Sequence, residues 1–228
     1  MRRAFTRFSP STRRERICKF TYERATSEIA PFAGLADLNA CRRKLRELQL
    51  IGIAPNGVGF GNLSVRDDAT RDFYITGSAT GGLSELTFAD CAKVIACDFE
   101  RNSLRYEGYA IPSSESLTHA AIYESDAAAR AVIHCHDSNF WLRLLDRGPK
   151  TSEAAKYGTP EMAREIMSLF ETTDAQKRKI FVMAGHQGGI VTFGRDLEEA
   201  FLVLMHERKK SAHCVNGAFH KRTPRDDK

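Results

Sequence analysis

Residues 130–137 read Arg-Ala-Val-Ile-His-Cys-His-Asp, and this stretch decides the fold. The apolar, β-branched run 131–133 predicts a short buried strand. Alternate residues of a strand face the same side of a sheet, so His134 and His136 point one way and Cys135 the other. Two neutral imidazoles this close suit zinc and its first-row neighbours, although two histidines at a strand end are also common without a metal.

The chain has 228 residues, of which 42% are hydrophobic and 28% are charged. These are ordinary globular values, and the length suffices for one large domain with its own core. The net charge of +5 is concentrated in residues 1–16 and 206–228. Basic ends are typically solvated tails, and no aromatic-interleaved basic motif indicates nucleic-acid binding. We therefore expect a basic N-terminal extension over residues 1–30, a domain over 31–212 and a basic tail over 213–228.

Six cysteines are spread along the chain without a Cys-x-x-Cys pair or a disulfide-framework spacing. Free thiols are typical of a reducing compartment, so we expect a cytoplasmic protein. No apolar run approaches the length that a membrane span requires, and no membrane partner is expected.

Helical and strand patterns alternate along the chain. The apolar spacing predicts helices over residues 17–30, 38–51, 113–122, 138–145, 161–170 and 197–211, and strands over 57–66, 73–76, 93–99, 103–106, 131–133, 180–184 and 190–193. Asp37 is the expected N-cap of the second helix, and Arg42 is expected on its outer, solvated face. The alternation indicates one α/β domain with helices on both faces of a sheet.

Two glycine-rich segments precede the histidines. The strand over residues 57–66 carries Asn62 and Ser64 on one face, and such polarity suits a neighbouring anionic ligand. The second segment, residues 77–82, reads Gly-Ser-Ala-Thr-Gly-Gly. Its backbone N–H groups could form an anion-binding nest, or the segment could be a plain flexible hairpin loop. It is not a Walker loop, because no Gly-Lys-Ser/Thr follows it.

The sequence Ser113-Ser-Glu-Ser opens a predicted helix. Ser113 or Ser114 suits the N-cap, and Glu115 in the first turn suits the helix dipole. A helix N-terminus is also an anion-binding site, so capping and ligand binding are compatible here.

Short segments occur in a fixed order between about residue 38 and residue 207. They are Gly-Asn-Leu-Ser at 61–64, Ile-Thr-Gly-Ser at 75–78, Pro-Ser-Ser-Glu at 112–115 with His119, Ala-Val-Ile-His-Cys-His at 131–136, Tyr-Gly-Thr at 157–159, and Gly-His at 185–186 before Gly194. In this order and spacing the set resembles the class II aldolase/adducin family. The resemblance implies a three-layer α/β/α sandwich around a mostly antiparallel mixed sheet.

The resemblance also implies roles for individual residues. His134, His136 and His186 match three ligands of a divalent metal, usually zinc, with manganese or cobalt as alternatives. Glu115 matches the acid/base beside that metal. Substrate phosphate in the family is held at positions that match Asn62, Ser78, Ser113 and Ser114. Family enzymes act on small molecules and are commonly homotetramers.

The chemistry of this set is coherent. Three neutral histidines leave a divalent cation its full charge, so it can polarise a carbonyl and stabilise the enediolate formed when a C–C bond breaks. A nearby carboxylate can move the proton. We expect a metal-dependent, aldolase-type lyase that cleaves or forms a C–C bond in a small hydroxy-carbonyl compound, phosphorylated or not. The alternatives are a related epimerase, decarboxylase or dehydratase, and a non-catalytic adducin-like binding module.

Several positions depart from the family pattern. The third ligand lies in Gly185-His-Gln187 rather than Asn-His-Gly, and Ala79 stands where the phosphate loop commonly has glycine. Family aldolases take a proton from a tyrosine of the C-terminal tail. No tyrosine follows Tyr157 here, so Tyr157 and His220 are the candidates for that role. Glu115, where family epimerases tend to carry aspartate, favours an aldolase.

Overall fold

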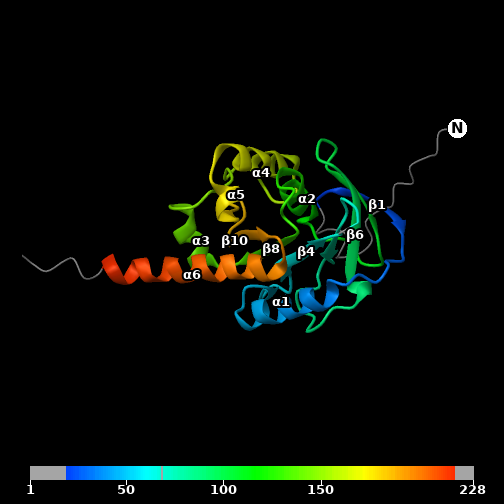
Figure 1. Ribbon diagram of the computed structural model, residues 1–228, viewed down its shortest axis with the longest axis horizontal. Coiled ribbons are helices and arrows are strands. Elements are labelled where there is room, and N and C mark those ends of the chain that lie inside the picture. The colour runs from blue at the N-terminus through cyan, green and yellow to red at the C-terminus, as the bar shows by residue number, and fades with distance from the viewer. Residues whose placement is uncertain (1–18, 68, 219–228) are drawn as a thin grey trace, which may run out of the picture.

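The computed structural model describes residues 19–67 and 69–218, with side chains described as far as Ser211. An eight-stranded sheet in the order β1-β7-β6-β5-β4-β8-β10-β9 runs through its centre (Figure 1). These strands are β1 (Thr21–Thr26), β4 (Asn62–Arg66), β5 (Phe73–Thr76), β6 (Cys91–Asp98), β7 (Ser103–Glu107), β8 (Ala131–His136), β9 (Ile180–Val182) and β10 (Gly189–Gly194). All neighbours pair antiparallel except β1 and β7, which run parallel, so the expected mixed and mostly antiparallel sheet is confirmed.

Helices cover both faces of the sheet (Figure 1). On one face lie α1 (Leu35–Glu47), α3 (Ser138–Leu145) and α6 (Leu197–Ala218); on the other lie α2 (Ser116–Ser125), α4 (Pro160–Thr172) and the short α5 (Ala175–Arg178). A small hairpin of β2 (Gly52–Ile53) and β3 (Gly59–Phe60) and a 3₁₀ turn, η1 (Phe88–Asp90), complete the described elements. Each face has its own hydrophobic core, which confirms the three-layer α/β arrangement.

The strand β8 lies between β4 and β10 and is buried on both faces. Ile133 and Cys135 pack into the core under α1 and α6, whereas Val132 packs into the core on the α2 side. His134 and His136 share the face of Val132, because side chains alternate along a strand. The opposite orientations predicted for Cys135 and the two histidines are therefore confirmed.

The start of the chain differs from the expectation. The helix predicted over residues 17–30 is wrong, because residues 21–26 form β1 and pair with β7. The edge of β7 offers unpaired backbone groups, and satisfying them outweighs a weak helical periodicity. Tyr22 also packs edge-to-face on Tyr106 of β7, a cross-strand contact that favours a strand. The central sheet thus includes residues that we assigned to the N-terminal extension.

The helix α1 also departs from its predicted bounds. It begins at Leu35 with Gly34 at the N-cap and ends at Glu47, so Asp37 lies in the first turn and is not the cap. Leu38, Cys41 and Leu45 form its buried stripe, as the spacing predicted.

The C-terminal helix α6 continues to Ala218, beyond the start of the predicted tail. Residues 1–18 and 219–228, which include His220, lie outside the described residues. None of the helices in the described part of the chain is long and apolar enough to cross a membrane.

Candidate active site

Three histidines meet at one end of β8. His134 and His136 come from β8 itself, and His186 comes from the loop between β9 and β10. The Nε2 atom of His136 lies 3.1 Å from that of His134 and 3.0 Å from that of His186. Tetrahedral zinc with Zn–N bonds of about 2.05 Å would separate its nitrogen ligands by about 3.3 Å. The three side chains could therefore hold one divalent metal ion.

Glycines shape the loop that carries His186. Gly188 has a φ of +79°, a left-handed conformation that side chains disfavour. A Cβ atom on Gly189 would lie 2.6 Å from the His186 ring, closer than packing allows. The backbone N–H of His186 donates to Met183 O over 3.0 Å, and that of Gly189 donates to His186 O over 2.8 Å. The absence of side chains at these glycines lets the third imidazole reach the other two.

Burial keeps all three imidazoles neutral near pH 7. Burial lowers the pKa of His136 to about 4. Burial, together with the nearby His136 and Lys19, lowers the pKa of His186 to about 3. Burial and the two neighbouring histidines hold the pKa of His134 well below its usual range. Neutral imidazoles present lone pairs rather than charge, which is the form that binds a metal.

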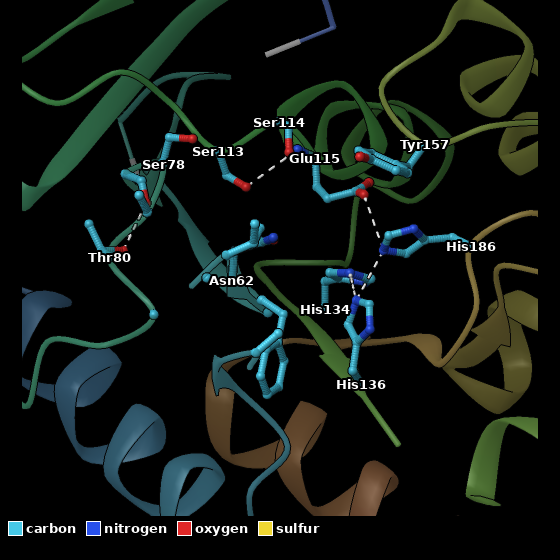
Figure 2. A pocket seen from close by; sticks show the side chains of 18 of the residues that line it. Asn62, Ser78, Thr80, Ser113, Ser114, Glu115, His134, His136, Tyr157 and His186 are labelled. Carbon is cyan, nitrogen blue, oxygen red and sulfur yellow. Dashed lines mark hydrogen bonds and ion pairs between the residues drawn. The ribbon is translucent and has the colours of Figure 1, made fainter. Parts of the chain in front are cut away.

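Glu115 faces this cluster from the opposite wall (Figure 2). Its Oε1 lies 3.9 Å from His186 Nε2, and the Thr118 hydroxyl donates to its Oε2 over 2.7 Å. The side chain is buried, and burial raises its pKa to about 7 despite the opposing Thr118 hydrogen bond and Lys19 charge. A carboxylate near neutral pKa beside a metal-binding cluster is suited to proton transfer.

The turn before α2 carries Glu115. The helix begins at Ser116 with Glu115 itself at the N-cap, so the prediction that Ser113 or Ser114 caps it is wrong. The Ser113 hydroxyl instead accepts a hydrogen bond from the Glu115 N–H over 3.3 Å. The Ser113 carbonyl accepts from both the N–H and the hydroxyl of Ser116. These bonds fix the turn on which the two serines and the glutamate stand.

A cavity of about 460 Å³ opens in front of the histidines. Figure 2 shows the histidines, Glu115 and Tyr157 at one end, Ser78 and Thr80 at the other, and Asn62 between them. The residues with predicted site roles all line this one cavity: Asn62, Ser78, Ser113, Ser114, Glu115, His134, His136, Tyr157 and His186. The Tyr157 ring packs against His186, with centroids 4.4 Å apart.

The loop over residues 77–82 is braced from behind by α1. The Arg42 side chain is only 2% exposed and donates to Thr80 O over 2.9 Å and Leu83 O over 3.2 Å. Arg46 donates to Gly81 O over 3.0 Å and also to Leu83 O. The prediction that Arg42 lies on the outer face is therefore wrong, because loop carbonyls compensate its burial.

This bracing orients the loop. Its carbonyls turn toward the arginines, whereas no acceptor within the described residues takes the N–H groups of Ala79, Thr80 and Gly81. Ala79 adopts a φ of +61°, so it takes the left-handed backbone conformation for which a glycine would be better suited. The loop is a braced wall of the cavity, and its N–H groups are available to an anionic ligand.

A buried polar network lies under Asn62. The Ser64 hydroxyl lies 2.7 Å from both His119 Nδ1 and the Tyr123 hydroxyl. Burial lowers the pKa of His119 to about 3, so its ring is neutral. The network explains the polar face of β4 and links that strand to α2, which carries Glu115 at its start.

Sequence reasoning missed three cations near the cavity. Arg42 and Arg46 stand behind the glycine-rich loop, and Lys19 lies over the Tyr157 ring. Helical periodicity alone cannot show that the backbone carbonyls of a distant loop lie against Arg42, one of several consecutive basic residues. The position of Lys19 depends on β1, which was not predicted.

The family described as Class II Aldolase and Adducin N-terminal domain matches residues 46–213. A 3-oxo-tetronate 4-phosphate decarboxylase from Haemophilus influenzae is 31% identical over 163 residues, which cover 62% of this chain and 70% of that protein.

Solved structures show the same fold. An L-fuculose 1-phosphate aldolase is 24% identical with a TM-score of 0.62, over 87% of this chain and 93% of that one. A sugar-phosphate aldolase from Thermotoga maritima is 16% identical with a TM-score of 0.63, over 83% of this chain and 97% of that one. From the match over most of its length, the chain belongs to the class II aldolase and adducin family.

Proposed function

We propose that this protein is a metal-dependent lyase of the aldolase type that makes or breaks a C–C bond in a small hydroxy-carbonyl substrate. The observation that carries the proposal is the position of Glu115 Oε1, 3.9 Å from the His186 Nε2 atom of a neutral three-histidine cluster that could hold a metal ion. A purely binding module has no physical need for a buried carboxylate at that place.

The donor set indicates which metal fits. Three imidazole nitrogens favour zinc, with manganese or cobalt as alternatives, and leave coordination positions open to a substrate. A bound divalent cation would act as a Lewis acid that polarises the substrate carbonyl and stabilises enediolate charge.

Glu115 is the proposed acid/base. In the bond-forming direction its carboxylate would take the proton from the carbon next to the carbonyl, and in cleavage the carboxylic acid would return it to that carbon of the enediolate. The Thr118 hydrogen bond fixes Oε2 and leaves Oε1 directed toward the histidines. Tyr157, which packs on His186, is the proposed donor of the proton that the aldehyde oxygen takes up as the C–C bond forms, and in cleavage it would take that proton back from the hydroxyl.

The other end of the cavity would hold an anionic group of the substrate, such as a phosphate. Asn62, Ser78, Ser113 and Ser114 line this part, together with the free N–H groups of the braced loop. Hydroxyl and backbone N–H donors are suited to phosphate oxygens.

Decarboxylation is the second candidate function, and the 31% identical decarboxylase favours it. Both reactions break a C–C bond next to a carbonyl and leave an enolate, so the same metal and acid/base serve either one. They differ in the fragment that leaves, which is an aldehyde in one case and CO₂ in the other.

We further propose that the protein works as a homotetramer. Light scattering on the full-length protein tests this assembly.

The metal-loaded enzyme tests the proposal. Incubation with hydroxy-ketones, hydroxy-aldehydes and their phosphates should yield an aldehyde plus a ketone if the lyase reaction occurs. Release of CO₂ from 3-oxo acids would favour the decarboxylase instead. A protein that takes up no zinc, manganese or cobalt would contradict both reactions and leave a binding module as the alternative.

A further inference from the structure

Lys19 approaches the histidine end of the cavity from outside. Its Nζ lies 3.4 Å from the centroid of the Tyr157 ring, and that ring packs on His186. The charge also reaches deeper, since Lys19 contributes to the lowered pKa of His186 and opposes the raised pKa of Glu115. A single exposed lysine is thus within electrostatic range of the proposed metal ligand and acid/base.

The backbone holds Lys19 in this position. Its carbonyl accepts a hydrogen bond from Asn102 Nδ2 over 2.8 Å, and the same amide donates to Gly158 O over 3.3 Å. A Cβ on Gly158 would lie 3.1 Å from both Lys19 Cβ and Ser114 O, so these segments are in close contact. The blue start of the described chain accordingly passes above Ser114 in Figure 2.

The cavity itself lacks positive side chains. Among the described residues that line it, there is no lysine or arginine, whereas Glu115 contributes a carboxyl group. No carboxylate of the described chain lies within ion-pair distance of Lys19 either. Arg42 and Arg46 are committed to loop carbonyls at the far end. Among the described residues, Lys19 is therefore the cation available to an acidic group that enters beside the histidines.

We propose that Lys19 is a specificity-determining residue, which binds an acidic group of the substrate at the Tyr157 edge of the cavity. This inference rests on the proposed function and narrows its substrate class to hydroxy-carbonyl acids. An ammonium on a flexible stem can leave the ring face and meet a carboxylate over a short distance. Lys19 lies outside residues 46–213, the region that matches the family. Substrate selectivity would therefore depend on a segment that precedes this region.

Two three-carbon probes isolate this interaction. Hydroxypyruvate and dihydroxyacetone share a hydroxy-ketone, but only the first carries a carboxylate. Their affinities for the zinc-loaded protein are measured by calorimetric titration for wild type, Lys19→Met and Lys19→Arg. Lys177→Met removes an exposed lysine of α5 and serves as the matched control.

Lys19→Met should weaken hydroxypyruvate binding roughly five- to tenfold, as expected for loss of one charged partner. Dihydroxyacetone binding should stay within about twofold, and Lys19→Arg should retain most of the hydroxypyruvate affinity. Equal effects on both probes, or no effect on either, would overturn the proposal.

Exchange of the dihydroxyacetone α-proton with deuterated solvent separates this inference from the proposed function. Suppose that wild type and Lys19→Met both catalyse the exchange and bind hydroxypyruvate equally well. The proposed role of Lys19 would then be refuted, and the proposed function would stand. If wild type bound neither probe, both proposals would be contradicted.

Discussion

Glu115 Oε1 and His186 Nε2 lie 3.9 Å apart, although one residue precedes α2 and the other lies in the loop between β9 and β10. Both side chains line the cavity and point toward one another at its histidine end (Figure 2). Their separation leaves Glu115 outside the three-nitrogen cluster but near any substrate bound there. This geometry separates metal binding from proton transfer, and each can be tested alone.

The first prediction concerns the metal. His136→Ala removes the nitrogen that lies about 3 Å from both other Nε2 atoms, so bound metal should fall from about one ion per chain to nearly none. Metal content after purification and dialysis, measured by plasma mass spectrometry, checks this. His206→Ala changes an exposed histidine of α6 and should keep the metal. Retention by both variants would place the metal elsewhere.

The second prediction concerns Glu115. Glu115→Gln keeps the shape and the Thr118 contact but removes the carboxyl group that can take up and release a proton near neutral pH, so kcat should fall by about 10²- to 10⁴-fold. Metal content should remain that of wild type. Steady-state kinetics on whichever substrate is turned over provide the measurement. Glu161→Gln, on the exposed start of α4, is the matched control, and full activity of Glu115→Gln would exclude the acid/base assignment.

Acidification should destabilise the metal-free protein. Folded His119, His136 and His186 have pKa values of about 3, 4 and 3, and burial holds the pKa of His134 well below its usual range, whereas unfolded histidines take up protons below about pH 6.5. Their contribution is present above that pH and is lost as the pH falls. Glu115 acts in the opposite direction, since its folded pKa of about 7 favours folding at lower pH and offsets one histidine.

Four histidines less Glu115 give a net difference of about three protons, which predicts a fall of about 4 kcal/mol in the free energy of unfolding per pH unit near pH 5.5. Urea unfolding between pH 7 and pH 5 measures it. His119→Gln should give a shallower dependence, whereas His206→Gln, at an exposed position, should leave the slope unchanged. A flat profile for wild type would show that these histidines become protonated in the folded state.

Replacing Arg42 should weaken both the fold and the glycine-rich loop. Arg42→Met removes the charged donor to the carbonyls of Thr80 and Leu83, which keep only the Leu83 N–H and Arg46, at a cost of about 2–3 kcal/mol for hydrogen bonds to a charged group. Urea unfolding gives the value directly. Arg43→Met, at the exposed neighbouring position, should stay within about 0.5 kcal/mol of wild type. Equal stability of the two variants would mean that the bracing contributes little.

The histidine strand was predictable because two local signals agree there. The apolar run before His134 predicts burial, and the two-residue period fixes the common face of His134 and His136. The place of His186 followed only from the family resemblance, since no local pattern shows that two segments 50 residues apart meet.

The remaining differences are long-range. β1 is a strand because it pairs with the edge of β7, about 80 residues later in the chain. The sequence of residues 17–30 alone does not indicate that pairing. Arg42 is buried because the carbonyls of a distant loop surround its guanidinium. In both places tertiary hydrogen bonding outweighs local periodicity, and those contacts depend on the assembled sheet.

Because side chains alternate along β8, metal binding depends on the register in which β8 pairs with its neighbouring strands. If β8 slipped by one residue against β4 and β10, His134 and His136 would enter the apolar layer and Cys135 would face the cavity. Such a misfolded chain would retain the same strands yet lose the nitrogen donors. The amount of zinc bound per refolded chain would therefore measure the fraction of molecules in which β8 pairs in its native register. Circular dichroism cannot measure this fraction, because both registers contain the same strands.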